Sequence, residues 1–143
     1  MRRAIPMLAL LLAAAGPTPI QPGKWQTTIT IVDATIPGAP LGVLAAMRGR
    51  PTVVTSCVTA TDAARGPRAA LERTGGRCRY TEFSMTGGAV RSTMVCVGGR
   101  EQSVMTHATG SFTPTSITMD AVGSGAGGMT MKSHMASRRI GGF

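Results

Sequence analysis

The sequence is poor in aromatic residues, acidic residues, histidine and cysteine. It contains one Trp, one Tyr, three Phe, six Asp and Glu, two His and three Cys among 143 residues. So few aromatic rings leave little surface on which nucleic-acid bases could stack. The chain has no Cys-x-x-Cys pair for zinc, no Gly-x-Ser-x-Gly motif of a serine hydrolase and no locally paired carboxylates of a glycosidase. We therefore expect a protein that is not an enzyme, uses no cofactor and binds no nucleic acid.

The chain begins with basic residues and an apolar run. Two arginines precede the run from Ala4 to Ala15, and a Gly-Pro pair ends it. A membrane-spanning helix needs about 20 apolar residues, whereas this shorter pattern is typical of a secretory signal peptide. We therefore expect residues 1–15 to be removed on export to the periplasm, and residues 16–143 to form a single β domain without a transmembrane segment.

Most of the remaining chain predicts β-structure. Period-two alternation and β-branched residues, bounded by Gly or Pro, indicate strands. We expect strands at residues 24–31, 51–59, 78–86, 89–97, 102–112, 115–123 and 129–139. Short links between neighbours favour an antiparallel meander. About seven strands with little helix must curl to bury one face, so we expect a twisted sheet, half-barrel or barrel.

One short broken helix is expected between the second and third strands, at residues 62–73. Thr61 can cap its start and Asp62 lies in its first turn. Gly66 and Pro67 interrupt it, because proline removes a hydrogen-bond donor and crowds the preceding turn. The Pro- and Gly-rich connection at residues 34–50 predicts at most one short helical turn.

Two of the three cysteines bracket a predicted hairpin whose turn is Gly87-Gly88. A two-residue turn aligns the apolar residues of the two strands but sets Cys78 and Cys96 on opposite faces. One bulge between the turn and the cysteines keeps the apolar residues aligned and also brings Cys78 opposite Cys96. We therefore predict a bulge and a Cys78–Cys96 disulfide. Cys57 is then a free thiol, or a thiol that links two chains.

Several motifs together resemble a family of small exported bacterial proteins. They are Pro-Gly-Lys-Trp before the first strand, Val-Thr-Ser-Cys-Val-Thr, the cysteine-bracketed hairpin, Met-Thr-Met-Lys-Ser and the ending Ser-Arg-Arg-Ile-Gly-Gly-Phe. From about Gly23 to its end the chain resembles domain-of-unknown-function family 3617. Members typically end in Arg-Ile-Gly-Asp-Cys, and the resemblance implies that this last cysteine is the partner of the one at position 57. This chain ends in Phe143 instead, which leaves Cys57 without that partner. The family is functionally uncharacterised, and the resemblance implies no activity.

The last predicted strand carries the strongest candidate metal site. Met129, Met131 and Met135 share one face of a strand, whereas His134 points to the other. Thioethers suit Cu(I) in an oxidising compartment, but methionines also fill the interiors of sheets. We expect packing and keep a Cu(I) site as the alternative. His107 is predicted to be a solvated surface residue.

Basic residues outnumber acidic ones by 15 to 6, which gives a net charge of +9 that attracts acidic partners. The densest basic cluster comprises Arg65, Arg68, Arg73, Arg77 and Arg79. It is either a solvated face or a site for the anionic head groups of envelope lipids. The chain is thus predicted to be a non-enzymatic binding or envelope-interaction module. Its expected partner is an anionic envelope lipid or a small apolar ligand, with Cu(I) binding as the alternative function.

Overall fold

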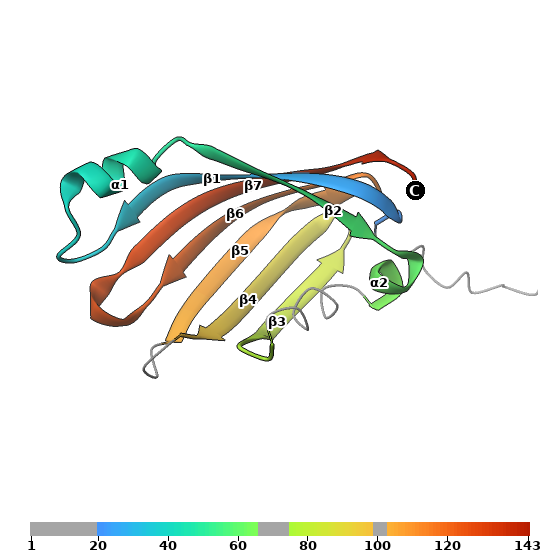
Figure 1. Ribbon diagram of the computed structural model, residues 1–143. Helices are drawn as coiled ribbons and strands as arrows, with labels where there is room; N and C mark the ends of the chain where they lie inside the picture. The colour runs from blue at the N-terminus through green and yellow to red at the C-terminus, as the bar shows by residue number, and fades with distance from the viewer. Residues whose placement is uncertain (1–19, 66–74, 99–102) are drawn as a thin grey trace, which may run out of the picture.

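The computed structural model describes residues 20–65, 75–98 and 103–143 (Figure 1). The predicted signal peptide, residues 1–15, and the expected break at Gly66-Pro67 lie outside these ranges. The elements are β1 (Gly23–Thr35), α1 (Leu41–Met47), β2 (Pro51–Val58), α2 (Ala60–Arg65), β3 (Cys78–Thr86), β4 (Ala89–Val97), β5 (Ser103–Thr113), β6 (Ser116–Ser124), the 3-10 helix η2 (Ala126–Gly128) and β7 (Thr130–Gly141). Mostly β-structure is therefore confirmed, with each strand close to its predicted bounds.

All seven strands form one antiparallel sheet in the order β2-β1-β7-β6-β5-β4-β3. From β3 to β7, strands that follow one another in the sequence also pair, as a meander requires. The first strand, β1, pairs with the last strand, β7, and β2 extends the sheet beyond β1. The sheet does not close, because its two edges are β2 and β3. The connection between them contains α2.

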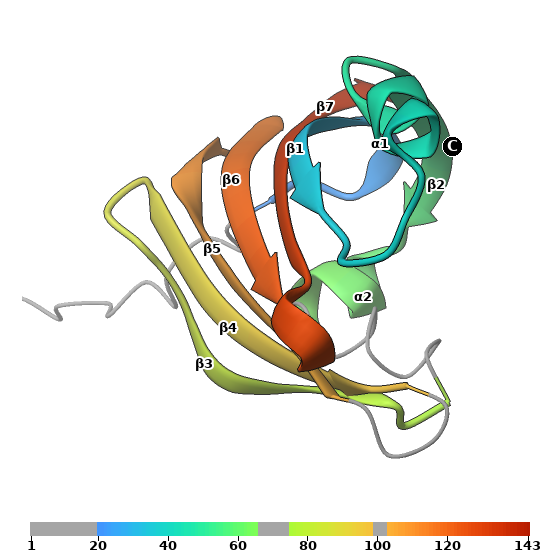
Figure 2. The same cartoon turned by 90° about the vertical axis from the view of Figure 1, so that its left-hand side faces the viewer.

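The sheet is strongly curved, and α2 lies on its concave side near the end of β2 (Figures 1 and 2). Strand pairing assigns each side chain to a face, because directly paired residues point to the same side. Trp25, Ile29 and Ile31 share one face. Side chains on this face are more buried than those on the other. It is therefore the concave face, where curvature brings neighbouring side chains together.

Only a small set of apolar side chains is buried. Among the described residues, these are Trp25, Ala34, Leu44, Ala63, Val90 and Ala108. No large side chain is fully buried in the described part of the chain. A curved sheet with one short helix on its concave side thus leaves much of its apolar face accessible to solvent.

Two short helices flank β2, and both differ in extent from the predicted ones. The first, α1, has seven residues and exceeds the single turn expected within residues 34–50, because Leu44 packs into a buried position beside β1. The second, α2, begins earlier than predicted. Its cap is Thr59 rather than Thr61, since the Thr59 hydroxyl accepts the Asp62 N–H at 3.0 Å and the Asp62 carboxylate accepts the Thr59 N–H at 3.3 Å.

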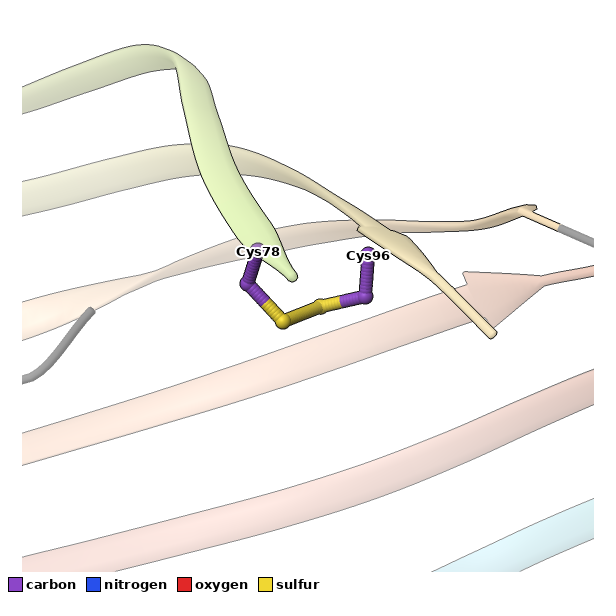
Figure 3. The surroundings of a disulfide bond; sticks show 2 residues. All are labelled: Cys78 and Cys96. Carbon is purple, nitrogen blue, oxygen red and sulfur yellow. A yellow bond between two sulfur atoms is a disulfide. The ribbon is translucent and has the colours of Figure 1, made fainter. Parts of the chain in front are cut away.

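The β3–β4 hairpin contains the predicted bulge, and the predicted disulfide joins its two strands (Figure 3). Gly87 and Gly88 form a two-residue turn with φ values of 60° and 78°, which favour glycine. The pairing then shifts by one residue between Tyr80 and Glu82. This shift brings Cys78 opposite Cys96, with their Cα atoms 4.0 Å apart.

The strands β5 and β6 approach each other closely at Gly110. Gly110 pairs with Met119, and a Cβ atom added at Gly110 would overlap the carbonyl oxygen of Thr118. Only glycine fits such an approach without movement of the backbone. A glycine at this point of the concave face allows neighbouring strands to fold toward each other, which helps the sheet to curve.

Candidate functional site

The concave face of the sheet is the candidate site, because it presents flexible apolar side chains on rigid strands. Its strand residues include five methionines, which are Met85, Met94, Met119, Met131 and Met135. All five are half-buried. Methionine is unbranched and polarisable, and it is overused on surfaces that accept apolar partners of varied shape.

Some apolar side chains of the concave face remain exposed to solvent. Ile29 retains 37% of its exposure and Phe83 retains 36%, although both point to the concave side. Trp25, in contrast, is only 2% exposed. Its indole N–H donates to the Gln21 carbonyl at 2.9 Å, which anchors the segment before β1 across this end of the sheet.

A second aromatic group lies on β3, near the opposite edge of the sheet. The rings of Tyr80 and Phe83 are 5.3 Å apart and tilted by 54°, an arrangement that favours aromatic pairs. Both side chains belong to the concave face, since Tyr80 pairs with Met94 and Phe83 with Ser92. Burial raises the pKa of the Tyr80 hydroxyl above its ordinary value of 10.0.

One charged residue, Arg139, lies among the described strand residues of the concave face. It pairs with Trp25, and its Nε donates to the Pro22 carbonyl at 2.8 Å. Arg139 is not among the site residues predicted from the sequence. The signal was present, because period-two alternation from Met131 and Met135 reaches Arg139 and places Arg138 on the other face.

Both histidines lie on the convex face. His134 Nδ1 lies 2.7 Å from Asp120 Oδ1, and His107 Nδ1 lies 2.9 Å from the Thr93 hydroxyl. His107 is exposed, as predicted for a surface residue. No group of three or more His, Cys, Asp or Glu residues that could hold a metal ion occurs in the described ranges.

The methionines proposed for Cu(I) are only partly brought together. Met131 and Met135 share the concave face, and Met119 lies opposite Met135. Met129 precedes β7 and lies close to Gly125. His134 belongs to the convex face and contacts Asp120, so the methionine face contains no described strand histidine.

The predicted arginine cluster is described only in part. Arg68 and Arg73 lie outside the described residues, and Arg65 is described only as the last residue of α2. Arg77 and Arg79 are exposed at the start of the hairpin. The anion site predicted from this cluster therefore stays a prediction.

The remaining cysteine, Cys57, is exposed on the edge strand β2 and forms no disulfide. Of the helices in the described segments, none has the length and apolar character needed to cross a membrane.

Comparison with known proteins identifies a family but no characterised relative. A family model described as a protein of unknown function (DUF3617) matches residues 20–142. No curated protein and no solved structure matches the chain.

Proposed function

Because the chain belongs to the DUF3617 family of proteins of unknown function across residues 20–142, we propose its function from the geometry of the sheet. The protein is an exported binding module that holds a small apolar ligand on its concave face. The observation that carries the proposal is an open, curved sheet whose accessible inner face is lined by methionines. Apolar side chains left in contact with water gain free energy when a ligand covers them, at about 25 cal/mol per Å².

Binding, rather than catalysis, is the role that the residues of this face support. The described strand residues on the concave face include no carboxylate and no histidine, and its two cysteines, Cys78 and Cys96, are joined to each other. General acid–base catalysis most often uses such groups, and nucleophilic hydroxyls are commonly activated by them. We therefore assign no chemical step to the site.

Export is supported by the N-terminal pattern and by the disulfide. The run from Ala4 to Ala15 has the length and flanking residues of a signal peptide. The Cys78–Cys96 bridge is compatible with an oxidising compartment such as the periplasm. An apolar ligand in that compartment must cross an aqueous space, so a carrier with an open apolar face has a physical use there.

A polar substitution on the concave face tests the proposal. We expect Met119→Asn to weaken binding of N-phenylnaphthylamine, a neutral apolar dye, by about tenfold, because the amide must be desolvated beneath the dye. Binding is measured from the rise in dye fluorescence on titration with protein.

The matched control is Val122→Asn, also on β6, which changes a 47% exposed side chain on the convex face. This variant should bind the dye as the unaltered protein does. Equal affinities for the unaltered protein and both variants, with circular dichroism spectra preserved, would place the ligand elsewhere. Absence of dye binding by the unaltered protein would contradict the proposed function.

A further inference from the structure

Arg139 is placed to recognise one end of a ligand. Alternation along β7 sets Arg139 on the same face as Met135 and Met131, while its neighbour Arg138 lies on the convex face and donates to the Gln26 side-chain oxygen at 3.2 Å. At about 3.3 Å per residue, Met135 lies about 13 Å along the strand from Arg139. A basic group thus stands at one end of an apolar surface.

The backbone around the guanidinium holds it in position. A Cβ atom added at Gly23 would lie 2.7 Å from Arg139 Nε and 3.1 Å from Cζ, so Gly23 leaves the space that the side chain occupies. The Nε donates to the Pro22 carbonyl at 2.8 Å. This bond fixes the plane of the guanidinium group. It does not involve the two terminal nitrogens, which form the end of the guanidinium fork.

The terminal nitrogens of Arg139 have no acidic partner in the described part of the chain. The ion pairs found there join Arg48 with Asp33 and His134 with Asp120. The acid on the helix of the concave side, Asp62, caps the start of α2. A half-buried guanidinium beside Trp25, on a face without carboxylates among its described strand residues, attracts an anion.

We propose that the concave face binds a single-chain amphiphile with a carboxylate head group. This inference rests on the proposed function and specifies the class of ligand. The terminal nitrogens of Arg139 donate to the two carboxylate oxygens, because the planar fork matches a planar carboxylate. The hydrocarbon chain lies along the methionines Met135 and Met119, and a dodecyl chain is long enough to reach them.

The test compares two amphiphiles that differ only in their head group. Dodecanoate and dodecanol are titrated below their aggregation limits into the unaltered protein, Arg139→Gln and Arg138→Gln. Binding is followed by calorimetry and by the fluorescence of Trp25, which is the single tryptophan of the chain and pairs with Arg139. Arg138→Gln is the matched control, since it removes an adjacent arginine from the opposite face.

We expect the unaltered protein to bind dodecanoate at least about tenfold more tightly than dodecanol, as a charge-assisted pair provides. Arg139→Gln should abolish this preference by weakening dodecanoate binding, whereas Arg138→Gln should keep it. Added salt should reduce the preference in the unaltered protein, which tests the pair even if Arg139→Gln does not fold.

Each other outcome overturns a defined part of the proposal. Equal binding of dodecanoate and dodecanol by the unaltered protein, or a preference that survives Arg139→Gln, would refute head-group recognition and leave the apolar site intact. Dodecyl phosphate is titrated in the same way as a third amphiphile, and tighter binding of it than of dodecanoate would refute the carboxylate assignment. Failure of both dodecanoate and dodecanol to bind would refute the proposed function as well.

Discussion

At the scale of single residues, the few aromatic side chains of this protein gather on one face. The chain contains five aromatic residues, and Trp25, Tyr80, Phe83 and Phe112 all belong to the concave face. The fifth, Phe143, is the exposed C-terminal residue. Aromatic rings bring a large apolar surface per residue, so their concentration on the open side of the sheet strengthens its assignment as a binding face.

The single tyrosine provides a pH-dependent test of this environment. Burial raises the pKa of Tyr80 above 10.0 in the folded protein. The unfolded chain therefore loses the tyrosine proton first as the pH rises. The stability from the neutral hydroxyl is complete below pH 10.0, and it is lost as the pH rises through the folded pKa. We expect the tyrosinate absorbance of the folded protein to appear at higher pH than that of the urea-unfolded chain.

The control for this titration is Tyr80→Phe. Its free energy of unfolding, measured with urea, should fall less steeply above pH 10.0 than that of the unaltered protein. Identical titration curves for the folded and unfolded chains would show that the hydroxyl is not desolvated.

At the scale of secondary-structure elements, curvature depends on how closely β5 and β6 approach. Gly110 leaves no room for a side chain beside the Thr118 carbonyl. Gly123, on β6 and on the same face, is different, since a Cβ atom added there would lie 3.5 Å from the Thr106 hydroxyl oxygen. Gly110 is therefore a crowded position, and Gly123 is an uncrowded position on the same face that serves as its control.

We expect Gly110→Ala to lower the free energy of unfolding by about 1–3 kcal/mol, because the new methyl group forces the backbones of β5 and β6 apart. Gly123→Ala should be tolerated, since the contact it makes is an ordinary van der Waals distance. Urea unfolding of both variants measures the difference. If both variants lose equal stability, the close approach at Gly110 does not shape the sheet.

At the scale of the whole molecule, charge is separated between the two faces. The convex face of the strands carries both signs, with Lys132 and Arg138 on β7 and Asp120 on β6. The concave face carries Arg139 alone among its described strand residues. Among the described strand residues, the apolar face is thus almost uncharged, although the whole chain has a net charge of +9. This separation suits a module that is solvated on one side and binds on the other.

The state of the mature protein tests export and cysteine pairing together. Expressed with its full N-terminus in a Gram-negative host, the protein should be recovered from the periplasm with Gly16 as its first residue. Alkylation under denaturing, non-reducing conditions should label Cys57 alone in the monomer, because Cys78 and Cys96 are bridged. Intact-mass and peptide-mass spectrometry measure both properties. An uncleaved cytoplasmic product would contradict export, and label on Cys96 would contradict the bridge.

The sequence alone determined the strands and the hairpin. Alternation with a period of two and the Gly-Pro boundaries are local signals, and they located seven strands within a few residues. The bulge was also predictable, since the faces of Cys78 and Cys96 and the apolar pattern can agree only if one residue is inserted between the turn and the cysteines. The cap of α2 was placed two residues too late, because Thr59 and Thr61 are both possible caps and only the contact with Asp62 distinguishes them.

The tertiary structure alone decided the strand order, the curvature and the site. Pairing of β1 with β7 joins residues at opposite ends of the chain, and no local pattern specifies such a contact. That pairing places Arg139 beside Trp25, so a residue that reads in the sequence as one of two adjacent arginines becomes the charged group of an apolar face. The sheet stays open because its two edge strands, β2 and β3, do not pair with each other. Side-chain period fixes which face a residue occupies, whereas only the long-range pairing of strands fixes what that face encloses.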